Sequence, residues 1–103
     1  MSKPLELARR LIAGEQHWCT HHLAVDKDGI VVSPMSQRAV KRCAFGAVLA
    51  AAYQLTHHLD VAHTLARQLL VPIGYPTTNM SVNDNRGHSA VLALFDQLIA
   101  DFT

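Results

Sequence analysis

The chain has 103 residues, of which 50% are hydrophobic and 17% are charged, and its formal net charge at pH 7 is +1. This length and composition predict one globular domain over residues 1–103 and exclude a disordered tail. The near-neutral charge argues against nucleic-acid binding and against attraction to an anionic membrane surface.

The longest apolar run, 47–53, is far shorter than the roughly 20 residues that a membrane span needs. The first ten residues are interrupted by charges and have no apolar stretch typical of a secretion signal. We therefore expect a cytoplasmic protein of bacterial or phage type. In a reducing cytoplasm its two cysteines, Cys19 and Cys43, are expected to be free thiols.

The first predicted helix has Pro4 in its first turn, a position that suits proline. Its apolar residues then recur at helical spacing, at Leu5, Ala8, Leu11 and Ile12. Gly14 is a plausible end of this helix. Further on, the Asp-Gly turn signal within 26–29 predicts a short β-hairpin between Leu23/Val25 and Ile30–Val32.

The central helix is predicted to begin at Ser36, a good N-cap residue, and its apolar positions continue to Leu55. Alanines and Gly46 make one face slim, so we expect another helix to approach it closely. On this prediction Cys43 lies about two turns inside the helix, on the buried stripe.

A break at His57-His58 precedes the third helix, for which Asp60 is the predicted cap. Its apolar side consists of Val61, Leu65, Leu69 and Leu70. Pro72, Gly74 and Pro76 then indicate a loop through Met80.

The last helix is amphipathic from Val91 to Phe102, and its start lies within 83–87. The predicted fold is mainly α, with about four helices around one core. A short β-hairpin or extended segment lies between the first and second helices.

The first candidate site combines the Cys43 thiol with the imidazole of His88. A thiol at a helix start is favoured as thiolate, and a nearby imidazole can take its proton. Asp84 or Asn83 could orient that imidazole, as in hydrolases of the papain type. Because Cys43 is predicted inside the helix and on its apolar side, a buried core cysteine is the favoured interpretation.

The second candidate is a zinc site in the segment 17–22. Alternation in an extended chain would place His17, Cys19 and His21 on one side, and a fourth ligand could come from Cys43, His63 or His88. The sequence contains neither HExxH nor CxxC, the spacings typical of zinc proteins. We therefore expect no metal and no other cofactor.

The third candidate is the polar segment 83–87 before the last helix. Asn83 and Asp84 suit a helix start, and Arg86 beside a helix N-terminus could bind an anion. Arg86 could also pair with Asp84, and Trp18 could anchor a partner. Finally, the basic residues Arg38, Lys41 and Arg42 are predicted to form a patch on the exposed side of the central helix.

The chain resembles a small family of bacterial and phage proteins of unknown function. The shared features are Trp18, the acidic-Gly turn at 26–29 followed by Val31 and Pro34, the run 39–49 around Cys43, and 82–88 followed by Val91-Leu92. Two positions depart from that pattern: Arg42 and Val82 stand where the family tends to carry an aromatic residue. The resemblance implies the fold and points to Cys43, Asn83, Asp84 and His88, but it implies no activity.

The leading functional hypothesis is a small accessory or regulatory domain, not an enzyme, that binds a protein partner or a second copy of itself. High apolar content and low net charge favour this interpretation. The alternative is a cysteine-dependent hydrolase or transferase that uses Cys43, His88 and Asp84. A zinc-binding protein is the third.

Overall fold

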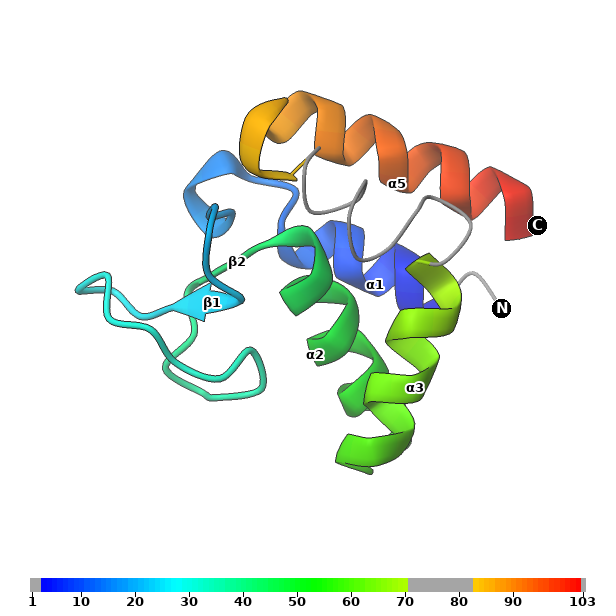
Figure 1. The fold of residues 1–103 in the computed structure, drawn as a ribbon, viewed down its shortest axis with the longest axis horizontal. Helices are drawn as coiled ribbons and strands as arrows, with labels where there is room; N and C mark the ends of the chain where they lie inside the picture. Colours follow the sequence, from blue (N-terminus) through cyan, green and yellow to red (C-terminus); the bar gives the residue numbers. More distant parts are fainter. Residues whose placement is uncertain (1–2, 71–82, 103) are drawn as a thin grey trace.

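The computed structural model describes residues 3–70 and 83–102, so the predicted loop from Pro72 to Met80 lies outside the described residues. Most of the described chain is helical, as predicted (Figure 1). The elements in chain order are α1 (Lys3–Leu11), the 3-10 helix η1 (Glu15–His17), β1 (Ala24–Val25), β2 (Lys41–Arg42), α2 (Ala44–Thr56), α3 (Leu59–Leu70) and α5 (His88–Phe102).

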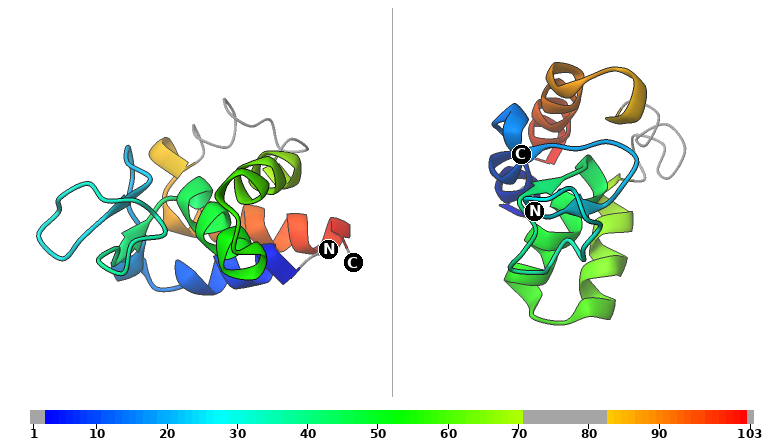
Figure 2. Two further views of the ribbon diagram at one scale, coloured as in Figure 1. Left: turned by 90° about the horizontal axis from the view of Figure 1, so that it is seen from below. Right: turned by 90° about the vertical axis from the view of Figure 1, so that its left-hand side faces the viewer.

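Helix α2 lies at the centre of the domain and packs against both α1 and α3, while α5 packs against α1 (Figures 1 and 2). Its residues from Ala44 to Ala52 are all buried, so it has no exposed face over this stretch. A helix that is apolar all round is expected in the interior, where neighbours cover every side. The short strands β1 and β2 lie beside the N-terminal end of α2 (Figure 1).

The prediction that α2 begins after Ser36 is wrong, because the helix begins at Ala44 with Cys43 as its N-cap. The backbone N–H of Val40 donates to the carbonyl of Val25, and that of Cys43 donates to the carbonyl of Leu23. Residues 40–43, which the apolar pattern had assigned to the helix, therefore pair with the extended segment 23–25. The basic residues Lys41 and Arg42 accordingly lie in β2 and not on a helix, and Arg42 Nε donates to the carbonyl of Pro34.

The predicted turn at 26–29 forms, with Gly29 N–H donating to the Asp26 carbonyl and Gly29 at a φ of 79°. The main pairing of β1, however, is antiparallel with β2, in the register Ala24↔Arg42 and Val25↔Lys41. The predicted partner segment contributes one bridge, Val25↔Val31. A short antiparallel pair between α1 and α2 is thus confirmed, with a different second strand.

Helices α1 and α3 pack closely on α2 as expected, and Gly46 permits a further close approach by Leu23, the residue before β1. A Cβ atom at this position would overlap the backbone carbonyl of Leu23. The same carbonyl accepts the hydrogen bond from Cys43 N–H, at 3.1 Å. The segment that leads into β1 therefore lies in direct contact with the first turn of α2.

The remaining helix boundaries differ from the predictions by a few residues. Helix α1 ends at Leu11 and not at Gly14, and Asp60 lies inside the first turn of α3 and is not its cap. On α3 the buried residues are Ala62, Ala66, Leu69 and Leu70, whereas Val61 is exposed. The predicted start of the last helix is confirmed, because α5 begins directly after Gly87. In the described residues, no helix has the length and apolar character needed to cross a membrane.

Candidate functional site

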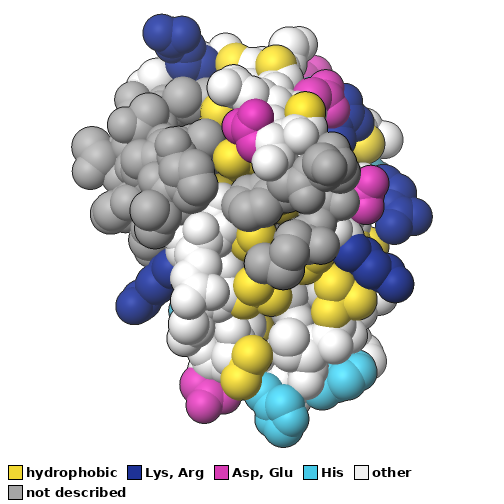
Figure 3. Space-filling model, turned by 90° about the vertical axis from the view of Figure 1, so that its right-hand side faces the viewer, with side chains coloured by type: hydrophobic (Ala, Val, Ile, Leu, Met, Phe, Trp, Pro, Cys, Tyr) yellow, Lys and Arg dark blue, Asp and Glu magenta, His cyan; other side chains and the backbone are white. Residues whose placement is uncertain are grey.

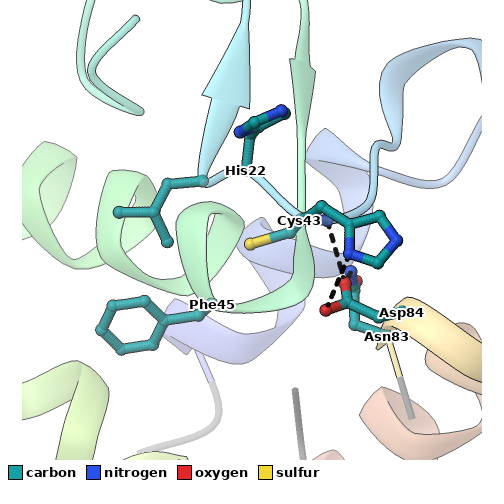
Figure 4. A pocket seen from close by; sticks show the side chains of 7 residues that line it. His22, Cys43, Phe45, Asn83 and Asp84 are labelled. Carbon is teal, nitrogen blue, oxygen red and sulfur yellow. Dashed lines mark hydrogen bonds and ion pairs between the residues drawn. The ribbon is translucent and has the colours of Figure 1, made fainter. Parts of the chain in front are cut away.

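A pocket of about 220 Å³ lies at the N-terminal end of α2, where three separate segments meet (Figure 4). The segment after η1 supplies two histidines and Leu23, the start of α2 supplies Cys43 and Phe45, and the helical turn before α5 supplies Asn83 and Asp84. The sulfur of Cys43 points into this space, on the side of Phe45 (Figure 4). The lining combines a thiol, two imidazoles and a carboxylate with two apolar side chains.

Cys43 is the N-cap of α2, and its Sγ accepts a hydrogen bond of 3.3 Å from Gly46 N–H. The prediction that this residue lies two turns inside the helix is therefore wrong. The expectation that it is buried is correct, since only 9% of its surface is exposed. At this position the sulfur faces the backbone N–H groups that a helix leaves unpaired at its start.

Burial raises the pKa of the Cys43 thiol, because a thiolate is poorly solvated there. Hydrogen bonds from the backbone of Gly46 and Phe45 act in the opposite direction, since they stabilise the thiolate, but burial is the larger effect. At neutral pH the resting group is therefore the thiol, and an attacking thiolate requires a base within the pocket.

Asn83 is 3% exposed, and its amide joins the segments that form the pocket. Its Oδ1 accepts from Trp18 Nε1 at 2.8 Å and from Ala44 N–H at 2.9 Å. Its Nδ2 donates to the Cys19 carbonyl at 3.2 Å and to Asp84 Oδ1 at 3.1 Å. One buried side chain thus holds the start of α2, the segment after η1 and the turn before α5 in a fixed arrangement.

Asp84 pairs with His21 on one wall of the pocket. Its Oδ1 accepts from His21 N–H at 3.0 Å, and its Oδ2 lies 3.6 Å from His21 Nδ1. Burial raises the pKa of this carboxyl, but the hydrogen bonds from His21 and Asn83 outweigh it and leave the pKa lowered. Asp84 is therefore a carboxylate at neutral pH. His21 itself has a φ of 67°, an uncommon conformation for a residue other than glycine.

His88 does not line the pocket. Its Nε2 lies 2.6 Å from the carbonyl oxygen of Ile12, and its ring stacks at a tilt against Trp18, with centroids 5.5 Å apart. The structure therefore places the predicted base of Cys43 between α1 and Trp18. Of the three predicted ligand-binding residues, Asn83 lines the pocket, whereas Trp18 donates to Asn83 from outside the lining and Arg86 is exposed.

The three residues proposed for zinc each have a different neighbour. His17 Nδ1 lies 3.1 Å from the Val40 carbonyl, the Cys19 thiol donates to the His22 carbonyl at 3.4 Å, and His21 faces Asp84. Within residues 3–70 and 83–102, no three His, Cys, Asp or Glu side chains are grouped as a metal ion would require.

A family model described as a family of unknown function, DUF6197, matches residues 1–101. The chain belongs to the DUF6197 family. The predicted membership of a family of unknown function is thereby confirmed. No curated protein and no solved structure matches this DUF6197 chain.

Sequence reasoning about this DUF6197 protein identified Cys43, Asn83 and Asp84, which the structure brings together, but missed the other pocket residues. His22, Leu23 and Phe45 were not singled out, and His21 was considered only as a metal ligand. The adjacent histidines directly before an apolar, strand-like segment were the available signal. Their meeting with Cys43 depends on the pairing of 23–25 with 40–43, which no local pattern reveals.

Proposed function

We propose that the pocket around Cys43 is the active site of a cysteine-dependent hydrolase or transferase. The observation that carries this proposal is the position of Cys43, which caps α2 inside a pocket that also contains an imidazole–carboxylate pair. A nucleophile, a base and a group that orients the base are the parts that covalent acyl transfer requires. The arrangement replaces His88 of the sequence-based hypothesis with His21.

The identity of the capping residue supports a chemical role. Serine, threonine, asparagine and aspartate are the side chains preferred at an N-cap, whereas sulfur is a weak hydrogen-bond acceptor. Serine in place of Cys43 would make a better cap for the Gly46 N–H, so helix stability alone does not favour a cysteine here. A thiol adds nucleophilicity that a hydroxyl lacks.

We assign the role of base to His21. Its Nδ1 lies 3.6 Å from Asp84 Oδ2, so the carboxylate can orient the ring that takes the thiol proton. The Cys43 sulfur then attacks the carbonyl carbon of the substrate, and the leaving group takes the proton back from His21. Water or a second acceptor releases the acyl group from the thioester in the reverse sequence of steps.

The size and lining of the pocket fit a small acyl group. A volume of about 220 Å³ lies below the range of roughly 300–1,000 Å³ that sites for drug-sized ligands occupy. Leu23 and Phe45 offer apolar contacts to the acyl chain. The proposal also places the chain in the cytoplasm, where a free thiol stays reduced.

The experiment is acylation by p-nitrophenyl acetate, followed by peptide mapping by mass spectrometry. We expect one acetyl group per chain on Cys43, with release of one equivalent of p-nitrophenol. His21→Ala should slow this step by about 100-fold, the usual range for a general base. His58→Ala is the control, because it removes an exposed imidazole outside the pocket lining and leaves the His21–Asp84 pair intact. Acetylation of lysines with Cys43 unmodified would refute the proposal.

A second candidate function is the accessory role, in which a protein partner or a second copy docks on the corner between α2 and α3. One observation favours it: four large apolar residues around this corner are 37–49% exposed, namely Tyr53, Leu55, Leu59 and Val61. Figure 3 shows apolar side chains near the histidine side chains at the lower end of the molecule, where this corner lies. Analytical ultracentrifugation of the wild-type chain and of Leu59→Glu tests self-association. If both sediment with the mass of a monomer, the chain does not form a homodimer.

A further inference from the structure

Cys19 and Cys43 lie side by side, although the two sit in different parts of the sequence. Trp18 and Arg42 form a parallel bridge, and the N–H of Cys19 donates to the carbonyl of Arg42 at 3.1 Å. Cys19 and Cys43 each follow the bridged pair by one residue, and the hydrogen bond joins Cys19 to the peptide unit between Arg42 and Cys43.

The hydrogen bond also limits the distance between the two residues. The Arg42 carbonyl oxygen and the Cys43 Cα belong to one peptide unit, and the Cys19 nitrogen is bonded to the Cys19 Cα. With a donor–acceptor distance of 3.1 Å, the two Cα atoms are at most about 7 Å apart. Disulfides usually join Cα atoms separated by roughly 4.4–6.8 Å, so this bound lies at the upper edge of the range that a disulfide spans.

Two further contacts hold this arrangement in place. The amide of Asn83 bonds the carbonyl of Cys19 through Nδ2 and the N–H of Ala44 through Oδ1. The Cys19 thiol donates to the carbonyl of His22, a residue that lines the pocket with Cys43. Both cysteines are free thiols in the structure.

Their electrostatics agree with this proximity, and the position of Cys43 sets the order of attack. Burial, followed by the negative charge of a Cys43 thiolate, raises the pKa of Cys19 to about 11. Cys43 is the thiol that caps α2, and its sulfur accepts the Gly46 N–H. It is also the one whose sulfur faces the pocket (Figure 4).

We propose that Cys19 and Cys43 form a reversible redox pair, which a low-molecular-weight disulfide such as oxidised glutathione converts into an intramolecular disulfide. The Cys43 thiolate attacks one sulfur of glutathione disulfide, forming a mixed disulfide and releasing one glutathione thiolate. The Cys19 thiolate then attacks the Cys43 sulfur and expels the second. The two protein thiol protons end on the two released glutathione molecules, so the protein loses two electrons and one glutathione disulfide gains them.

Disulfide formation would withdraw Cys43 from the pocket and break its bond with Gly46 N–H. Oxidation would therefore switch the site off, and a reduced thiol would switch it on again. This regulatory consequence rests on the proposed function, whereas the pairing of the cysteines rests on the geometry alone. Disulfides in cytoplasmic proteins are usually transient and redox-sensing, which fits such a role.

The experiment is titration of the folded chain with oxidised and reduced glutathione, read by intact mass and by peptide mapping after acid quenching. We expect the number of alkylatable thiols to fall from two to zero, with loss of two hydrogen atoms and a Cys19–Cys43 linked peptide. Cys19→Ser should instead accumulate one glutathione on Cys43. The wild-type linked peptide remains decisive if a variant does not fold.

Glutathione attached to both cysteines without a linked peptide, or disulfides only between chains, would overturn the pairing. The result is independent of the acylation experiment. If the disulfide forms but the reduced chain is not acetylated at Cys43, the redox pair stands and the proposed function is wrong. If acetylation occurs at Cys43 and no disulfide forms, the proposed function stands and the redox pair is wrong.

Discussion

Trp18 and Asn83 are joined by a 2.8 Å hydrogen bond from the indole Nε1 to the amide Oδ1, across 65 positions of sequence. The same amide oxygen accepts from the first N–H of α2. The buried Asn83 side chain therefore sets the relative position of the three segments that line the pocket. Replacement of Asn83 should therefore disturb all three segments.

We expect Asn83→Ala to lower the free energy of unfolding by about 3 kcal/mol, since it leaves several buried polar groups without partners. Those groups are Trp18 Nε1, Ala44 N–H and the Cys19 carbonyl. Asn85→Ala is the control, because Asn85 is exposed in the same turn and should cost less than about 0.5 kcal/mol. Urea denaturation measures both. Equal stabilities of the two variants would contradict the role of Asn83.

Gly46→Ala should destabilise the chain by about 2 kcal/mol or more, because the new methyl group overlaps the Leu23 backbone carbonyl. The strand segment would have to move away from α2, and the pocket would open. Gly14→Ala is the matched control, since its methyl group would meet only the flexible end of Gln16. Thermal unfolding followed by circular dichroism compares the two. A Gly46→Ala variant as stable as Gly14→Ala would show that the Leu23 carbonyl does not lie against Gly46.

Because its pKa is lowered, Asp84 should make a contribution to the free energy of unfolding that depends on pH. The unfolded chain binds a proton on this carboxyl more readily than the folded chain does. The contribution is therefore fully present above the ordinary aspartate pKa, roughly pH 4, and is lost as the pH falls through the lower folded value. Asp84→Asn should reduce the difference in stability between pH 6 and pH 3. Urea midpoints at both pH values test this, and an unchanged difference would refute it.

Cys19 should react slowly with iodoacetamide at pH 9, because a pKa of about 11 leaves little thiolate. We expect a rate tens of times lower than that of the unfolded chain, whose thiols are near their ordinary pKa. In Cys43→Ser the rate should rise in part, since the charge of Cys43 is gone while burial, the larger cause of the raised pKa, remains. Mass spectrometry of the Cys19 peptide follows both. The same rate in the variant would show that the two thiols do not interact.

His88→Ala separates the structural from the catalytic role of this histidine. Loss of its hydrogen bond to the Ile12 carbonyl should cost about 1–2 kcal/mol. Alkylation of Cys43 should be unaffected, because His88 does not line the pocket. Stability by urea and alkylation at pH 8 are measured on the same variant. A large fall in Cys43 reactivity with the fold intact would restore the Cys43–His88 pair expected from sequence.

The sequence by itself determined which segments become helices and which residue types meet in the core. Apolar spacing of 3.6 residues, the break at His57-His58 and the Asp-Gly turn are local signals, and each depends on residues only a few positions apart. The start of α5 was also readable, because the polar residues before it suit a helix end. These features follow from backbone propensity and from burial of one helix face.

Only the tertiary structure decided where α2 begins and what surrounds Cys43. Residues 39–43 fit a helix by their pattern, yet hydrogen bonds from Val40 and Cys43 to the strand segment 23–25 were more favourable. The same arrangement turned Cys43 into a cap, placed His21 and His22 in the lining of the same pocket and joined Cys19 N–H to the carbonyl of Arg42. Contacts between segments so far apart depend on backbone hydrogen bonds and on the buried amide of Asn83. Neither produces a periodic pattern in the sequence.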